Sequence, residues 1–85
     1  MVPIRLRYAR KRAKLTQARL GTLAGIDINL ARSRICQYEL GVHRPTFEMV
    51  CKFAEILNLP ECYFYTINDN LAEDIIELYY DKYCN

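Results

Sequence analysis

The side chains best suited to chemistry lie in one segment, GIDINLARSRICQYELG, which spans residues 25–41. Its hydrogen-bonding groups are close together in the chain: Arg32, Ser33, Arg34 and Gln37. Guanidinium, hydroxyl and amide groups bind phosphates and the edges of nucleic-acid bases. We find no glycine-rich phosphate loop, paired-carboxylate cleft or Cys/His dyad beside them. These residue types therefore point to binding and not to an enzyme.

Metal binding has little support in the sequence. The cysteines are scattered without a C-x-x-C pair, at Cys36, Cys51, Cys62 and Cys84, and His43 is the only histidine. Structural zinc sites need clustered Cys and His ligands. We therefore expect buried reduced thiols, no metal and no other cofactor.

The segment has two faces when it is placed on a helix. At 100° per residue, Ala31, Ile35 and Tyr38 fall on one side. The opposite side is a polar strip of Ser33, Cys36 and Gln37, flanked by Arg32 and Arg34. The major groove of DNA is wide enough to admit such a helix. An ordinary amphipathic surface helix has the same pattern, so the segment alone leaves both interpretations open.

Helical periodicity also dominates the elements that must position this segment. We expect a first helix from Pro3 to Ala13, with Ile4, Leu6 and Ala9 or Ala13 facing inward. Thr16 should cap a second helix that ends near Ala24, before Gly25. Further helices are expected at residues 47–57 and 60–65, and a last one, capped by Asn70 with Glu73, should reach Tyr83.

Length and charge narrow the function. The 85 residues suit one domain, without a secretory or membrane-spanning segment, and we expect a cytoplasmic protein. Residues 1–46 hold ten Lys/Arg against two acids, which gives +8, and residues 47–85 hold two against eight, which gives −6. A basic half attached to an acidic half suggests a polyanionic partner for the first half.

The arrangement of motifs over roughly residues 4–65 resembles the helix-turn-helix domain of the phage repressor and Cro family, also called the XRE family. L-T-Q at residues 15–17 opens the first helix of the motif, and the buried positions and turn are matched by Leu20, Ala24, Gly25 and Ile26. The end of the recognition helix is matched by Ile35, Tyr38, Glu39 and Gly41, and the following helices by Pro45, residues 47–57, Leu59 and Pro60. The resemblance implies an all-α, five-helix, lambda-repressor-like DNA-binding domain at residues 1–67. An additional C-terminal helix at residues 68–85 would pack on this domain or dimerise.

The resemblance also implies roles for individual residues. Base edges would be read by Arg32, Ser33 and Gln37, with Asn29 and Cys36 on the same strip. Phosphates would be contacted by Gln17, Arg34, His43, Arg44, Thr46 and Lys14, and Arg12 could add charge there. Arg34 could instead contact a base. Arg10 and Glu39 are similar to an ion pair that joins the first and third helices. The other arginines of the first helix are expected to be solvated, and Gly21 stands where the family usually has alanine.

The chain departs from the family between Gly25 and Gly41, where it is about four residues longer, roughly one helical turn. If Asp27 caps the third helix, that helix gains a turn and Asn29 joins the outward strip. If the helix begins near Ala31, the extra residues form a longer turn. We favour the longer helix, spanning about residues 28–39, because Ile28 then falls at the edge of the core face.

The last helix carries two apolar stripes, one of Leu71, Ile75 and Leu78 and one of Ala72, Ile76, Tyr79 and Tyr83. One stripe can pack on the domain. The second would then be an exposed apolar surface, which is uncommon on monomers, so we favour a homodimer. A helix that packs both stripes on its own core is the alternative.

The function expected from these features is sequence-specific binding of double-stranded DNA by a transcriptional regulator, most simply a repressor. No small-molecule ligand or membrane association is evident. The alternative is an antitoxin-like or other protein-interaction module that uses the acidic last helix.

Overall fold

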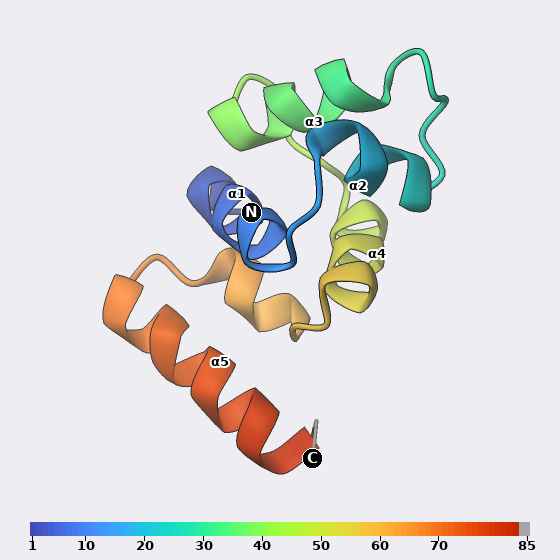
Figure 1. Cartoon of the computed structure of the whole chain (residues 1–85). Helices are drawn as coiled ribbons and strands as arrows, with labels where there is room; N and C mark the ends of the chain where they lie inside the picture. Colours follow the sequence, from blue (N-terminus) through green and yellow to red (C-terminus); the bar gives the residue numbers. More distant parts are fainter. Residues whose placement is uncertain (84–85) are drawn as a thin grey trace.

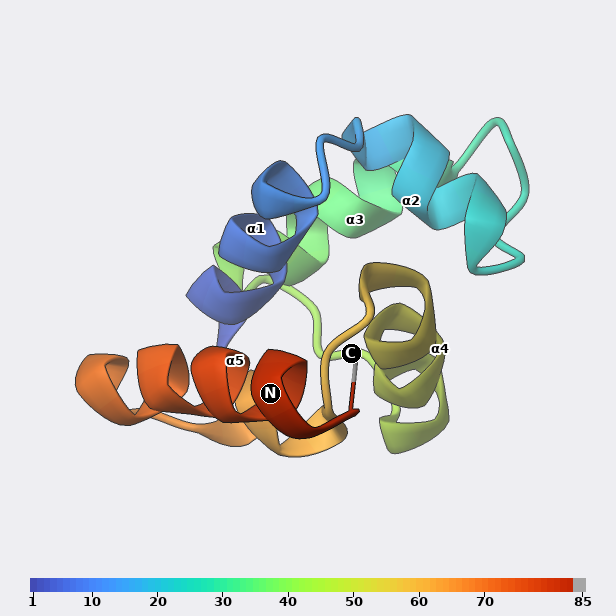
Figure 2. The same cartoon turned by 60° about the horizontal axis from the view of Figure 1, so that its bottom comes forward.

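A computed structural model of the chain describes residues 1–83, which are all-α and contain no strand. The elements are α1 (Pro3–Arg12), α2 (Gln17–Leu23), α3 (Ala31–Leu40), α4 (Phe47–Leu57), the 3-10 helix η1 (Glu61–Tyr65) and α5 (Asp69–Tyr83). Helices α2 and α3 lie together at one end of the molecule, and α5 crosses the opposite end (Figure 1). A second view, in Figure 2, shows the same separation, with α5 beside α1.

The first two helices begin and end where local chemistry requires. Pro3 stands in the first turn of α1, where its missing N–H costs no hydrogen bond. The Thr16 hydroxyl caps α2 by accepting a hydrogen bond from the backbone N–H of Arg19 at 3.1 Å. Gly25 follows α2 with φ of 88°, a left-handed conformation that favours glycine. These boundaries agree with the prediction.

The core lies between all six elements, with contributions from each of them. Its largest fully buried side chains are Tyr63, Phe53, Phe64, Leu6, Leu20, Ile35 and Val50. Tyr38 meets Phe53 edge to face, with ring centroids 6.1 Å apart. Burial raises the pKa of Tyr63 to about 12, so this phenol stays neutral at physiological pH.

Helix α3 begins at Ala31, so the prediction of a longer helix from about residue 28 is wrong. The Asp27 carboxylate does not cap α3 but accepts a hydrogen bond from the Asn29 N–H at 2.8 Å. This local bond forms a turn that competes with helical structure. Ile28 is 74% exposed and does not touch the core face. The extra residues therefore lengthen the turn between α2 and α3.

The inward face of α1 also differs from the prediction. Ile4 is 53% exposed, whereas Leu6 and Ala9 are buried as expected, and Ala13 is exposed. Arg5 is buried at this face and was expected to be solvated. Its guanidinium donates to the carbonyls of Thr66 and Ile67, each at 2.9 Å, and to Asp69 Oδ1 at 2.8 Å.

Arg12, which was expected to add charge at a DNA backbone, is exposed and contacts the C-terminal region. Its Nη1 donates to the Tyr80 hydroxyl at 3.2 Å, and its guanidinium lies 4.6 Å from the centre of the Tyr80 ring. The Tyr80 hydroxyl in turn donates to the Asn58 carbonyl at 3.2 Å. Arg5 and Arg12 thus connect the basic first helix to the C-terminal segment.

Helix α5 starts earlier than predicted and packs on the core through Ala72 and Ile76, with the partly buried Ile75 and Tyr80 beside them. The side chain of Asn68, and not that of Asn70, accepts the Leu71 N–H at 2.9 Å. Ala72 and Ile76 are 2% and 7% exposed and belong to the core. Ile76 is therefore committed to the chain's own core, which corrects its assignment to a dimer contact.

Candidate nucleic-acid interface

A hollow on the outer surface joins α3 to α2 and to the turn between them. We call it the reading hollow, and its lining residues are Gln17, Asn29, Arg32, Ser33, Cys36 and Gln37. Arg32 and Ser33 are exposed, and Gln37 is half-buried. On the opposite side of α3, Ile35 is fully buried and Tyr38 is 7% exposed. Helix α3 therefore has one anchored face and one polar face that is open to solvent.

Asn29 lines the reading hollow from the turn and not from a helix. Its backbone N–H is held by Asp27, which fixes the turn beside the beginning of α3. The amide side chain consequently belongs to the same surface as Ser33 and Gln37, although the predicted reason was wrong. A turn and a helix together form this part of the surface.

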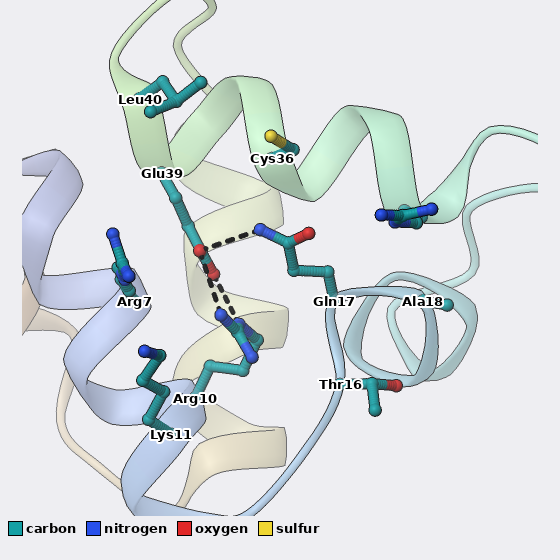
Figure 3. A pocket seen from close by; sticks show the side chains of 10 residues that line it. Arg7, Arg10, Lys11, Thr16, Gln17, Ala18, Cys36, Glu39 and Leu40 are labelled. Atoms are coloured by element: carbon teal, nitrogen blue, oxygen red, sulfur yellow. Dashed lines mark hydrogen bonds and ion pairs between the residues drawn. The ribbon is translucent and has the colours of Figure 1, made fainter.

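A second hollow lies between α1 and the pair α2 and α3, and Figure 3 shows it from close by. We call it the basic groove, and it is lined by Arg7, Arg10, Lys11, Thr16, Gln17, Ala18, Arg32, Cys36, Glu39 and Leu40. Gln17, Arg32 and Cys36 line both this groove and the reading hollow. The two hollows are therefore parts of one continuous surface.

The ion pair that the resemblance implies is present in the floor of the basic groove. Arg10 Nε donates to Glu39 Oε2 at 2.6 Å, and Nη2 donates to Oε1 at 3.2 Å. Gln17 Nε2 donates to the same Oε1 at 3.1 Å, and Arg10 Nη1 donates to the Leu15 carbonyl at 2.8 Å. Figure 3 shows Glu39 reaching from α3 toward both partners. Both charges of the pair are buried and compensated, which suits a structural role.

A third hollow continues the surface beyond the C-terminal end of α3. It is lined by Arg34, Gln37, Tyr38, His43 and Arg44, and it shares Gln37 with the reading hollow. Gly41 ends α3 with φ of 76°, and the N–H groups of Val42 and His43 donate to the Gln37 carbonyl at 3.0 and 3.4 Å. This turn places His43 and Arg44 beside Gln37.

Two predicted phosphate ligands lie outside these three hollows. Lys14 is exposed between α1 and α2, with φ of 60°. The Thr46 hydroxyl accepts the backbone N–H of Met49 at 3.1 Å and so caps α4. The structure therefore brings Gln17, Arg34, His43 and Arg44 onto the common surface but not these two residues.

Sequence reasoning missed Arg7 and Lys11, which line the basic groove from α1. A signal was available, because residues three and four apart on a helix lie on one face, and these two are four apart. They also flank Arg10, whose partner Glu39 was identified. The missing information was that α2 and α3 stand opposite this face of α1.

The cysteines do not form a metal centre in the described chain. Cys36 and Cys51 are partly buried and Cys62 is exposed, so the prediction of buried thiols is wrong for Cys62; Cys84 lies outside the described residues. Within residues 1–83 no three His, Cys, Asp or Glu side chains cluster in a way that could hold a metal ion. The pKa of the Cys51 thiol is raised mainly by desolvation and to a smaller extent by the negative charges of Glu61 and Glu48. This shift disfavours the thiolate.

Comparisons with known proteins agree with this geometry. A family model described as a helix-turn-helix domain matches residues 4–70. The chain is similar to the crystal structure of the transcriptional regulator BswR, with 38% sequence identity and a TM-score of 0.91. That alignment covers 93% of this chain and 78% of the other. No curated protein matches the chain. No helix among the described residues is long and apolar enough to cross a membrane.

Proposed function

The chain belongs to the helix-turn-helix domain family, and on this premise we propose that it is a transcriptional regulator that binds double-stranded DNA sequence-specifically. The observation that carries the proposal is the two-sided character of α3. Ile35 and Tyr38 anchor the helix in the core, while Ser33 lies on its open polar face. The similarity to a transcriptional regulator supports the same function.

In the proposed complex, α3 lies in the major groove and the reading hollow faces the bases. Arg32 suits guanine and Gln37 suits adenine, because each can form two hydrogen bonds to those base edges. Ser33 and Asn29 would add shorter polar contacts, and the Cys36 side chain would lie between them and the basic groove. A base change opposite one good bidentate contact costs about 1–3 kcal/mol.

Phosphate contacts on both sides of α3 would fix the register of the protein on DNA. An amide nitrogen carries two hydrogens, and Gln17 gives one of them to Glu39, which leaves the other for a phosphate oxygen. Arg34, His43 and Arg44 are placed to contact the backbone at the far end of α3. Lys14 and the backbone near Thr46 would contribute at the periphery.

We further propose that the protein acts as a homodimeric repressor that occludes a promoter. Leu71, Leu78 and Tyr83 on α5 are 52%, 55% and 72% exposed, and the partly buried Ile75 and Tyr79 lie on the same helix. Exposed apolar side chains at this spacing suit a second copy of α5. A twofold dimer would bind a roughly palindromic operator with half-sites about 10 bp apart.

Binding measurements with fluorescently labelled duplex DNA test the proposal. The affinity should fall steeply with salt, because each neutralised phosphate releases counterions. Replacing Gln17→Ala should weaken binding to every sequence alike, by about 1 kcal/mol or roughly fivefold. Thr22→Ala, on an exposed site of the same helix, is the matched control and should leave binding unchanged. Binding that is indifferent to salt, or a Gln17 variant of wild-type affinity, would contradict the proposed docking.

A further inference from the structure

We propose that the basic groove is a second DNA-backbone site, in which Arg7 and Lys11 bind phosphates that lie beyond those held by Gln17. The inference rests on the proposed function and assigns a role to Arg7, which was expected to be solvated, and to Lys11, for which the sequence predicted no role. It extends the DNA contact from α2 and α3 onto α1.

The floor of the groove contributes no free negative charge. Among the described residues, Glu39 is the only acidic one that lines the groove, and both of its oxygens accept hydrogen bonds from Arg10. All three nitrogens of the Arg10 guanidinium are occupied, since Nη1 binds the Leu15 carbonyl. Arg10 and Glu39 therefore cancel, and the net charge of the groove is set by its rim.

The rim carries uncompensated cations on two sides. Arg7 and Lys11 stand on α1, and Arg32 stands on α3 across the groove. All three are exposed, and within residues 1–83 none of them forms an ion pair. Cations that line a concave surface concentrate their field there and favour an anionic ligand. Guanidinium and ammonium groups are also the usual partners of phosphate oxygens.

The continuity of the surface identifies that anion as a DNA backbone. Gln17, Arg32 and Cys36 belong to the groove and to the reading hollow alike. In the proposed complex, a strand whose phosphate meets Gln17 would have its next phosphates at the opening of the groove. Figure 3 shows Arg7 and Lys11 on the α1 side of this opening, with Gln17 opposite.

The salt dependence of duplex binding tests the assignment, because it counts phosphate contacts. Each lost contact lowers the slope of log affinity against log salt by about 0.9. The double variant Arg7→Gln/Lys11→Gln should therefore have a slope smaller by about 1.8. Between about 50 and 200 mM salt, the wild type should lose roughly 12-fold more affinity than this variant. The base preference should stay the same, because phosphates carry no sequence information.

Two further variants distinguish the effect of cations in the basic groove from the effect of the total charge of the protein. Lys52→Gln/Lys82→Gln removes the same formal charge from the acidic half and should retain the wild-type slope. Arg7→Lys/Lys11→Arg keeps both cations in the groove and should retain it as well. If the wild type binds duplex DNA but Arg7→Gln/Lys11→Gln keeps its slope, or changes it no more than the Lys52 and Lys82 control does, the inference alone is wrong. A wild-type chain that binds no duplex overturns the proposed function and this inference together.

Discussion

At the scale of single residues, Glu39 connects the three helices that carry the basic side chains. It extends from α3, pairs with Arg10 of α1 and accepts a hydrogen bond from Gln17 of α2. Glu39 is 8% exposed, and its loss would leave the equally buried Arg10 without a counter-charge. This carboxylate therefore joins α1, α2 and α3, and its position suits a structural role.

We predict that Glu39→Ala lowers the free energy of unfolding by about 3–5 kcal/mol, the usual cost of removing one member of a buried pair. Urea unfolding followed by circular dichroism measures this change. The double variant Arg10→Met/Glu39→Met should be more stable than Glu39→Ala, because no charge is then left unpaired in the interior. A Glu39→Ala protein of wild-type stability would contradict the structural role of the pair.

How far single residues could be predicted depended on the sequence distance to their partners. The Arg10–Glu39 pair was found because the family resemblance relates the first and third helices. Arg5 was missed because its partners lie 61 to 64 positions away, in a connection whose path helical periodicity does not determine. Arg12 was missed for the same reason, since Tyr80 lies 68 positions away. An arginine on a helix looks solvated until the segment covering it is known.

At the scale of elements, the close approach of α2 and α3 explains why α3 begins where it does. Ala31, the first residue of α3, is fully buried against Gly21 of α2. A Cβ atom on Gly21 would lie 2.7 Å from the Ala31 Cβ and 2.9 Å from the Ala31 backbone. The glycine at this position, where alanine was expected from the family, therefore accommodates the beginning of α3.

We predict that Gly21→Ala destabilises the protein, although alanine is the better helix former by about 0.8–1 kcal/mol. The clash involves Ala31 backbone atoms and requires the helices to move apart, which typically costs about 1–3 kcal/mol in a well-packed interior. Thermal unfolding shows whether the melting temperature of Gly21→Ala is lower than that of the wild type, as we predict. Thr22→Ala, one position along on the exposed side of α2, should leave the melting temperature nearly unchanged. An increase in the melting temperature of Gly21→Ala would contradict this packing.

The presence of each helix was easier to predict from the sequence than the residue at which the helix begins. The boundaries of α4 agree with the prediction because Thr46, an apolar periodicity and a left-handed Asn58 define them locally. The beginning of α3 was mispredicted because Asp27 is a good cap in two different local structures, and the turn with Asn29 is the one that forms. When α3 begins at Ala31, this residue contacts Gly21 of α2. Helical periodicity in the sequence does not reveal that contact.

At the scale of the whole molecule, the division of charge along the chain becomes a division in space. The three hollows that hold Arg7, Arg32 and Arg44 are lined by α1–α3 and by the turns before and after α3. The acidic α5 lies at the opposite end of the molecule, away from α2 and α3 (Figures 1 and 2). The end formed by α2 and α3 therefore carries the basic hollows, and α5 exposes the apolar side chains of Leu71 and Leu78 at the other end. The sequence predicted the charge of each half, and the fold shows that α2 and α3 stand apart from α5, whereas Arg5 and Arg12 of α1 contact the C-terminal segment.

The central claim is that the open face of α3 reads DNA bases, and parallel selection from random duplexes by the wild type and Gln37→Ala tests it most directly. For the wild type, we predict one enriched motif with two inverted halves about 10 bp apart. For Gln37→Ala, we predict the same motif with the preference relaxed at one position in each half, by about 1–3 kcal/mol. A wild-type selection without an enriched motif, or a Gln37→Ala motif identical to that of the wild type at every position, would contradict the claim.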